Sequence, residues 1–150
     1  MDMRPNGSSG AFSGLLVTVS VLLIDQVTKL MAAHGGTGFV PRNPNYAFGI
    51  VGGSATVLIV GAVGVLGAFL LVAQTLATRF GISMMLPALV AGGTLGNTLD
   101  RLRLGSVRDF IVTPWAIINV ADLAVAAGVI GITITLATRV PRLRLATVSR

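Results

Sequence analysis

The sequence contains no cysteine and no glutamate, and it has a single histidine, His34. The absence of cysteine excludes disulfides, thiolate metal sites and a cysteine nucleophile, although it leaves the redox compartment undecided. One histidine cannot build a multi-histidine metal site, and we expect His34 to be an interfacial loop residue without a ligand role. Acid–base chemistry in this chain therefore depends on its few aspartates.

Charge is also scarce. Of the 150 residues only 11% are charged and 53% are hydrophobic, and the mean hydropathy is +0.87. A soluble domain of this size would carry about twice that charge, so the composition indicates an integral membrane protein. The net charge is +6, but the arginines lie mostly at the ends of apolar runs, where they orient a chain in the bilayer. Nucleic acid is therefore not expected as a partner.

The apolar runs predict an all-α membrane protein with four transmembrane helices, at 11–33, 55–77, 82–99 and 117–137. The first run continues into the charged segment DQVTKL, where a cleaved signal peptide would carry small residues, so we interpret it as a retained helix. These spans form one four-helix domain at 11–138. We expect a disordered cytoplasmic tail at 1–10 and a basic cytoplasmic tail at 139–150.

Small residues predict how the spans pack. Smooth faces for close helix contact are expected at Gly61, Gly64 and Gly67 in the second span and at Gly92 and Gly96 in the third. Pro87 is expected to kink the third span.

The arginines predict the orientation in the bilayer. Four spans place both termini and the turn at 78–81 on one side, which then carries Arg4, Arg79, Arg139, Arg142, Arg144 and Arg150. The loops at 34–53 and 100–116 carry Arg42, Arg101, Arg103 and Arg108. An excess of six to four favours cytoplasmic termini and places both loops outside.

The stretch 92–122 holds most of the acidic residues of the chain. It holds three of the five acidic residues, Asp100, Asp109 and Asp122, and also the amides Asn97 and Asn119. Ionisable side chains at membrane depth are costly and mark functional sites by default. Three interpretations of these acids stay open from the residues alone: an aspartic protease pair that shares a proton, a proton or cation site of a transporter, and structural ion pairs with the nearby arginines.

A fourth acid, Asp25, lies near the outer end of the first span. Asp25 and Lys29 are four residues apart, so they share a helix face and can pair. Either the pair supports the site, or it is a structural ion pair that reaches the membrane interface.

Four motifs occur along the chain: DQVTK at 25–29, N-x-x-x-A-F-G at 43–49, GGTLGNTLDRLRLGSVRDFI at 92–111 and NVAD at 119–122. With them the chain resembles the lipoprotein signal peptidases, the type II signal peptidases of bacterial plasma membranes. The resemblance implies that Asp109 and Asp122 are the catalytic aspartates and that no metal or organic cofactor is needed. It also implies that further residues support the site or bind substrate: Asp25, Lys29, Asn43, Asn97, Asp100, Arg101 and Asn119.

The resemblance thus implies an intramembrane aspartic endopeptidase of the bacterial plasma membrane with its active site at the outer face. The substrate would be a prolipoprotein whose signal peptide ends before a diacylglyceryl-modified cysteine. The partners would be this lipid-modified signal peptide and membrane lipids, with no obligate protein partner. Within the site we expect Asp100 and Arg101 to pair at the end of the third helix. Asn119 is expected to bind the peptide or to orient the two acids.

The chain departs from the family pattern in its outer segments. The pair Asn45-Tyr46 stands where Gly-Ala is usual, and Ile118 stands where an aromatic is usual. Only thirteen residues separate Lys29 from Asn43 and only twelve separate Asp109 from Asp122. We therefore expect the small outer sheet of relatives to be reduced or absent. The alternatives are a divergent member with a different membrane-peptide substrate or a binding role, and, less favoured, a small transporter subunit.

Overall fold

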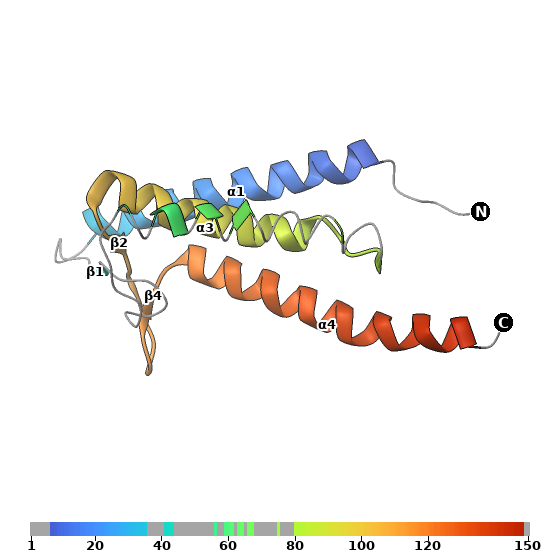
Figure 1. Cartoon of the computed structure of the whole chain (residues 1–150). Helices are drawn as coiled ribbons and strands as arrows, with labels where there is room; N and C mark the ends of the chain where they lie inside the picture. The colour runs from blue at the N-terminus through green and yellow to red at the C-terminus, as the bar shows by residue number, and fades with distance from the viewer. Residues whose placement is uncertain are drawn as a thin grey trace.

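The computed structural model describes residues 7–35, 41–43 and 80–148, together with isolated positions at 56, 59–61, 63–64, 66–67 and 75. Three long helices run through this part of the chain: α1 (Gly7–His34), α3 (Met85–Leu104) and α4 (Val120–Val148). Figure 1 shows them side by side, with α3 packed against both α1 and α4, which contact each other much less. The start of α1 and the end of α4 lie at one end of the bundle and the strands lie at the other.

Four two-residue strands form two antiparallel ladders at that second end. In the first ladder β1 (Arg42–Asn43) pairs with β2 (Val107–Arg108). In the second, β3 (Ile111–Val112) pairs with β4 (Ile117–Ile118) to form a hairpin. The side chain and backbone of Thr113 both bond to Ala116 across the turn of this hairpin. A small, reduced β element is therefore present where the sequence predicted it reduced or absent.

Local sequence signals explain where α3 begins and ends. Pro87 lies in the first turn, where its missing N–H has no partner within the helix, so it helps to start the helix. Gly105 follows the last residue with φ at 70°, and its N–H bonds to the carbonyl of Arg101 at 3.0 Å. This left-handed cap is the usual way in which a glycine ends a helix.

Glycines on α3 allow its neighbours to approach closely. A Cβ atom on Gly92 would lie 2.7 Å from the carbonyl oxygen of Thr18 on α1, and one on Gly96 would lie 2.6 Å from a carboxylate oxygen of Asp25. The predicted close packing at Gly92 and Gly96 is confirmed, and Gly93 makes the same kind of contact with Ala121 on α4. The second span gives no such evidence, because no atom of the described residues lies within 4 Å of a Cβ built on Gly61, Gly64 or Gly67.

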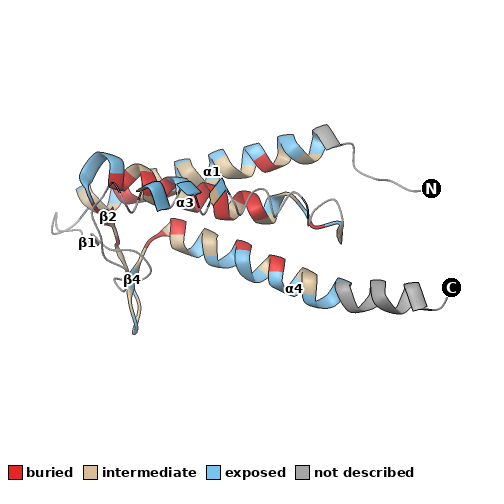
Figure 2. Ribbon diagram, in the orientation of Figure 1, coloured by how far each residue is buried: buried red, intermediate tan, exposed pale blue. Residues whose placement is uncertain are grey.

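The helices expose apolar side chains along their length, and buried polar side chains gather inside the bundle at the end that carries the strands. Figure 2 places most buried positions on α3 and on the faces that look toward it. Large hydrophobic side chains of α1 and α4 are exposed along their outer faces, among them Phe12, Leu16, Leu23, Ile130 and Ile134. Two of the described helices are long and apolar enough to cross a membrane, Ser9–His34 and Val120–Arg139. Such a surface fits a lipid environment better than water.

Several predicted boundaries were wrong. α1 begins at Gly7, so Gly7–Gly10 belong to a helix and not to a disordered tail, and His34 is the last residue of that helix and not part of a loop. α3 extends five residues beyond Leu99 because nothing ends it before Gly105. The fourth helix begins at Val120, since the two residues before Asn119 are in β4. The limits of the second span lie outside the described residues, and the isolated positions described there are helical.

Candidate active site

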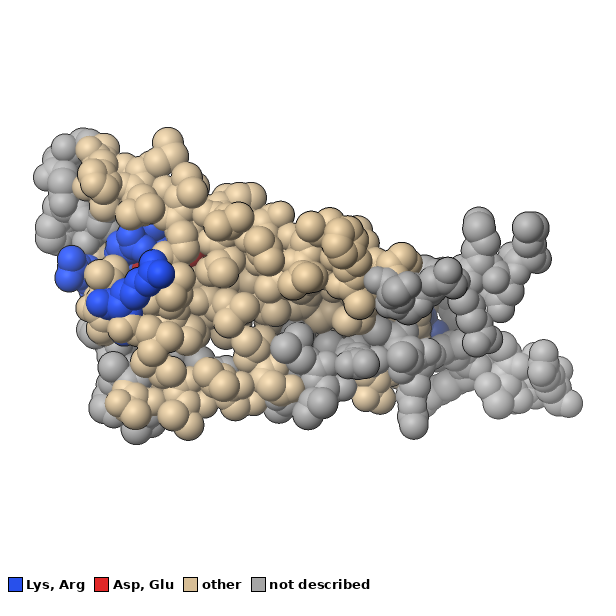
Figure 3. Space-filling model, turned by 90° about the horizontal axis from the view of Figure 1, so that it is seen from above, with Lys and Arg blue, Asp and Glu red and all other residues tan. Residues whose placement is uncertain are grey.

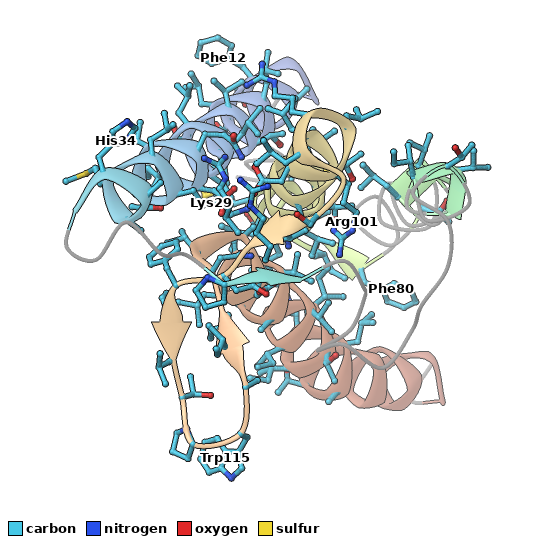
Figure 4. All side chains as sticks on the ribbon, turned by 90° about the vertical axis from the view of Figure 1, so that its left-hand side faces the viewer. Phe12, Lys29, His34, Phe80, Arg101 and Trp115 are labelled. Atoms are coloured by element: carbon cyan, nitrogen blue, oxygen red, sulfur yellow. The ribbon has the colours of Figure 1, made fainter. Side chains whose placement is uncertain are left out.

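A cluster of polar side chains fills the strand end of the bundle, between the three helices. Asp25, Lys29 and Asn119 are completely buried, and Asp100 and Asp109 are almost completely buried. Figure 4 shows Lys29 directed into this region, whereas Trp115 stands at the far tip of the β3–β4 hairpin. Burial of this many ionisable groups is tolerated only when they pair and form hydrogen bonds, and here they do.

The first part of the cluster is the ion pair of α1. Lys29 Nζ lies 2.8 Å from Asp25 Oδ2 and 3.4 Å from Asp100 Oδ2, and it also donates to Asn97 Oδ1 at 2.8 Å. The other oxygen of Asp25 accepts the backbone N–H of Ala121 at 3.0 Å. The pair therefore lies inside the bundle and contacts both α3 and α4, which excludes the interfacial interpretation. Asp25 serves as a second cap on the first turn of α4.

The second part is the start of α4, where Asn119 and Asp122 form a reciprocal capping box. Asn119 Oδ1 accepts the N–H of Asp122 at 3.0 Å, and the Asn119 N–H donates to Asp122 Oδ2 at 3.2 Å. The other Asp122 oxygen accepts from Asn97 Nδ2 at 2.8 Å. Asp122 is thus fixed in the first turn of the helix, where the positive end of the helix dipole favours an anion.

Asn119 also connects the two aspartates that the sequence singled out. Its Nδ2 donates to Asp109 Oδ1 at 2.7 Å and to Asn97 Oδ1 at 3.1 Å. One asparagine therefore contacts Asp109 with its side chain and Asp122 with both backbone and side chain. Asn119 was expected to bind the peptide or to orient the two acids, and in the structure it contacts both of them.

Asp109 directly follows strand β2, which fixes its position. It follows Arg108 directly, and its backbone N–H donates to the carbonyl of Pro41 at 3.1 Å. In the β1–β2 ladder Asn43 pairs with Val107, which brings the backbone of Asn43 to the strand that leads into Asp109. The backbone of Asn43 is therefore close to the site.

The third part surrounds Asp100, and its main partner was missed by the sequence analysis. Arg108 binds Asp100 through Nη2 at 2.7 Å, through Nε at 3.2 Å and through its backbone N–H at 3.1 Å. Gln26 donates to Asp25 and Asp100 and accepts from Arg108 Nη2 at 3.1 Å. Arg108 lies eight residues after Asp100, beyond the end of α3, and Gln26 lies 74 residues before Asp100 and 82 before Arg108, so no spacing within one helix identifies these contacts.

The predicted pairing of Asp100 with Arg101 was wrong, because the cations on Asp100 are Arg108 and Lys29. Consecutive residues of a helix point in directions about 100° apart, so they do not face each other. Arg101 is buried and donates to the carbonyl of Asn97, one turn earlier on α3. It remains part of the site's helix but not the partner of Asp100.

The cluster brings together oppositely charged groups in nearly equal number. Asp25 and Asp100 are matched by Lys29 and Arg108 through the contacts above, while Asp109 accepts from Asn119 and Asp122 accepts from Asn97. Among the described residues no group of three or more His, Cys, Asp or Glu side chains is placed to hold a metal ion. The four aspartates therefore lie in one largely buried network of charged and amide side chains.

The fold and the cluster define a class, that of helical membrane proteins with a buried acidic centre. Two solved structures, both described as bacterial membrane enzymes, share this fold. One gives a TM-score of 0.71 at 29% identity and covers 83% of this chain and 87% of its own. The other gives 0.66 at 28% identity and covers 82% and 91%.

Sequence comparison makes the assignment specific. The family description "Signal peptidase (SPase) II" matches residues 17–138. The lipoprotein signal peptidase of Methylobacterium radiotolerans is 34% identical over an alignment of 142 residues, and the match covers 80% of this chain and 82% of that protein. The lipoprotein signal peptidase of Moorella thermoacetica is 35% identical over 135 residues, covering 77% and 87%. The chain belongs to the signal peptidase II family.

Proposed function

We propose that this protein removes the signal peptide of prolipoproteins and that Asp109 and Asp122 are its catalytic pair. Membership of an aspartic protease family supports the reaction. The observation that supports the residues is the double contact of Asn119, which binds Asp109 and caps Asp122. The ionised acid takes a proton from water, and the protonated acid polarises the carbonyl of the scissile peptide bond.

The rest of the cluster would hold this pair in place. Lys29 donates to Asn97, which in turn donates to Asp122, so the ion pair of α1 orients the acid on α4 through one amide. Asp25 adds a cap to the same helix. Preorganised donors of this kind lower the reorganisation that a reaction needs. Asp25, Lys29 and Asn97 are therefore proposed as supporting residues, along with Asp100 and Arg101.

The substrate class follows from the family and from the location of the site. Prolipoprotein signal peptides are apolar helices, and we infer that the substrate helix enters from the membrane and unwinds near the acids. The outer faces of α1 and α4 are apolar, so the site is surrounded by surface that fits lipid. We propose four spans for this arrangement, with the second at 55–77.

Incubation of the purified protein with a diacylglyceryl-modified prolipoprotein tests the activity. We expect a shortened product on a gel, cut before the modified cysteine. The matched control is the same precursor without the lipid, which should be cleaved much more slowly if the lipid is recognised. Cleavage of neither form by folded protein would contradict the proposal. Cleavage of other membrane peptides alone would indicate the divergent specificity that the altered outer segments suggested.

We further propose that both termini are cytoplasmic and that the strand end faces outward. The proposal rests on the arginine count, six on the side of the termini against four in the two loops at the strand end, where Figure 3 shows the smaller basic group on the surface. Trp115 is the best reporter, because 91% of it is exposed at the hairpin tip, whereas Ser106 is buried.

A Trp115→Cys variant should react with a membrane-impermeant thiol reagent added outside intact spheroplasts, since the chain has no other cysteine. The measurement is mass-tagging on a gel before and after lysis. The unmodified protein is the control and should not react. Labelling that appears only after lysis would reverse the orientation and move the site to the cytoplasmic face.

A further inference from the structure

The structure contains a polar contact that the proposed mechanism does not use. Arg108 presents two guanidinium nitrogens to the two oxygens of Asp100, and its own backbone N–H bonds to one of them as well. Its Nη2 reaches a third element, since it also donates to Gln26 Oε1 on α1. The Arg108 side chain is only 13% exposed and that of Asp100 only 1%. Such a two-pronged bond fixes direction as well as distance.

This contact lies directly before Asp109. Arg108 is the last residue of β2, and Asp109 follows it without any intervening residue. On the opposite side, β2 is held by β1, and the Asp109 N–H bonds to Pro41. The strand is therefore attached to α3 and α1 through the Arg108 side chain, and to Pro41 and β1 through backbone hydrogen bonds. Displacement of Arg108 would move the backbone from which Asp109 projects.

The same contact also determines where Lys29 donates. Asp100 lies 3.4 Å from Lys29 Nζ, whereas Asp25 and Asn97 lie at 2.8 Å. With Arg108 on both its oxygens, Asp100 leaves the shorter bonds of Lys29 to Asp25 and Asn97. Without Arg108, the buried carboxylate of Asp100 would draw the ammonium group toward itself and away from Asn97, the amide that contacts Asp122.

We propose that Arg108 is a positioning residue for the peptidase reaction, because it fixes Asp109 through the strand and Asp122 through Lys29 and Asn97. This inference rests on the proposed function. It assigns to Arg108 no contact with substrate, so the residue should affect turnover more than substrate binding.

The test compares Arg108→Gln with Arg103→Gln. Arg103 lies at the exposed end of the same helix as Asp100 and has the same charge, so it controls for the loss of one arginine. We expect kcat of Arg108→Gln to fall by about 100-fold with KM nearly unchanged, since a misplacement of about 1 Å has effects of this size. Arg103→Gln should stay within about twofold of the unchanged protein. Activities are expressed per folded protein, as determined by thermal denaturation in detergent.

Two further variants keep the test decisive if Arg108→Gln folds poorly. Arg108→Lys keeps the charge but loses the planar guanidinium group that binds both oxygens of Asp100. Its kcat should therefore lie between those of the unchanged protein and Arg108→Gln. Asp100→Asn combined with Arg108→Gln removes both members of the pair. Its loss should be smaller than the product of the two single losses, because both changes disturb one contact.

The outcomes separate this inference from the proposed function. If Asp109→Asn and Asp122→Asn abolish turnover while Arg108→Gln leaves kcat unchanged, only the role of Arg108 is refuted. A loss that is fully explained by a smaller folded fraction, or an equal loss in Arg103→Gln, refutes it too. If either aspartate variant keeps its turnover, the catalytic pair itself fails, whatever Arg108 does.

Discussion

Replacement of either Asp109 or Asp122 by asparagine should abolish cleavage of a lipid-modified prolipoprotein. Asparagine keeps the shape of the side chain and can still accept the N–H of Asn119, but it cannot take a proton from water. Loss of one member of a catalytic unit typically lowers kcat by about 10⁴-fold or more. The measurement is turnover on a gel, with binding of the precursor followed separately and expected to persist.

The double variant and the pH profile report whether the acids act as a unit. The loss in Asp109→Asn combined with Asp122→Asn should equal that of one single variant, because the remaining acid alone activates no water. Activity of the unchanged protein should have a bell-shaped pH dependence that belongs to the pair and not to either residue. Asp2→Asn provides the same chemical change at the beginning of the chain and should leave activity unchanged. Retained turnover in one single variant would remove that residue from catalysis, and Asp100 would be the next candidate.

Replacement of Lys29 by methionine should have the largest effect on stability. Lys29 and Asp25 are both fully buried, 2.8 Å apart. Removal of one partner of a buried pair leaves a charge without compensation, which typically costs about 3–5 kcal/mol. The same change also removes the donor that orients Asn97, so turnover should fall. The measurement is the free energy of unfolding in detergent together with kcat on the same preparation.

Val27→Met is the matched control for Lys29→Met. Val27 is exposed on the same helix, so this change should alter the free energy of unfolding by no more than about 0.5 kcal/mol. Asp25→Asn should lower activity while the protein still inserts and folds, since the amide keeps the size of the side chain. Asp25→Asn added to Lys29→Met should restore part of the lost stability, because neither charge then remains unpaired. A cost below about 1 kcal/mol for Lys29→Met would mean that the pair contributes only as much as one at the surface.

Two pairs of polar residues were identifiable from local spacing, whereas the catalytic pair was predicted from the family resemblance. Asp25 and Lys29 share a face at four residues' separation, and they do pair. Asn119 and Asp122 have the spacing of a capping box, and they form one. The end of α3 is likewise marked by Gly105, although the helix was predicted to stop at Leu99. The family assignment follows from the same motifs.

Contacts between distant segments could not be predicted in the same way. Gln26 and Arg108 are separated by 82 residues, and they meet only because glycines on α3 let α1 approach and because β1 pairs with β2. The partner of Asp100 was mistaken for its neighbour Arg101, since sequence proximity on a helix does not give facing side chains.

The sequence by itself determined that this chain is mostly apolar, which aspartates are candidates for acid–base chemistry and which family the chain belongs to. The apolar character follows from composition. The candidate acids and the family follow from motifs, either residues one helical turn apart or a sequence pattern shared with the family. Only the tertiary structure decided that Asn119 connects Asp109 to Asp122 and that Arg108 neutralises Asp100. These contacts depend on the packing of three helices and the register of a two-residue ladder, neither of which is encoded in any short stretch of residues.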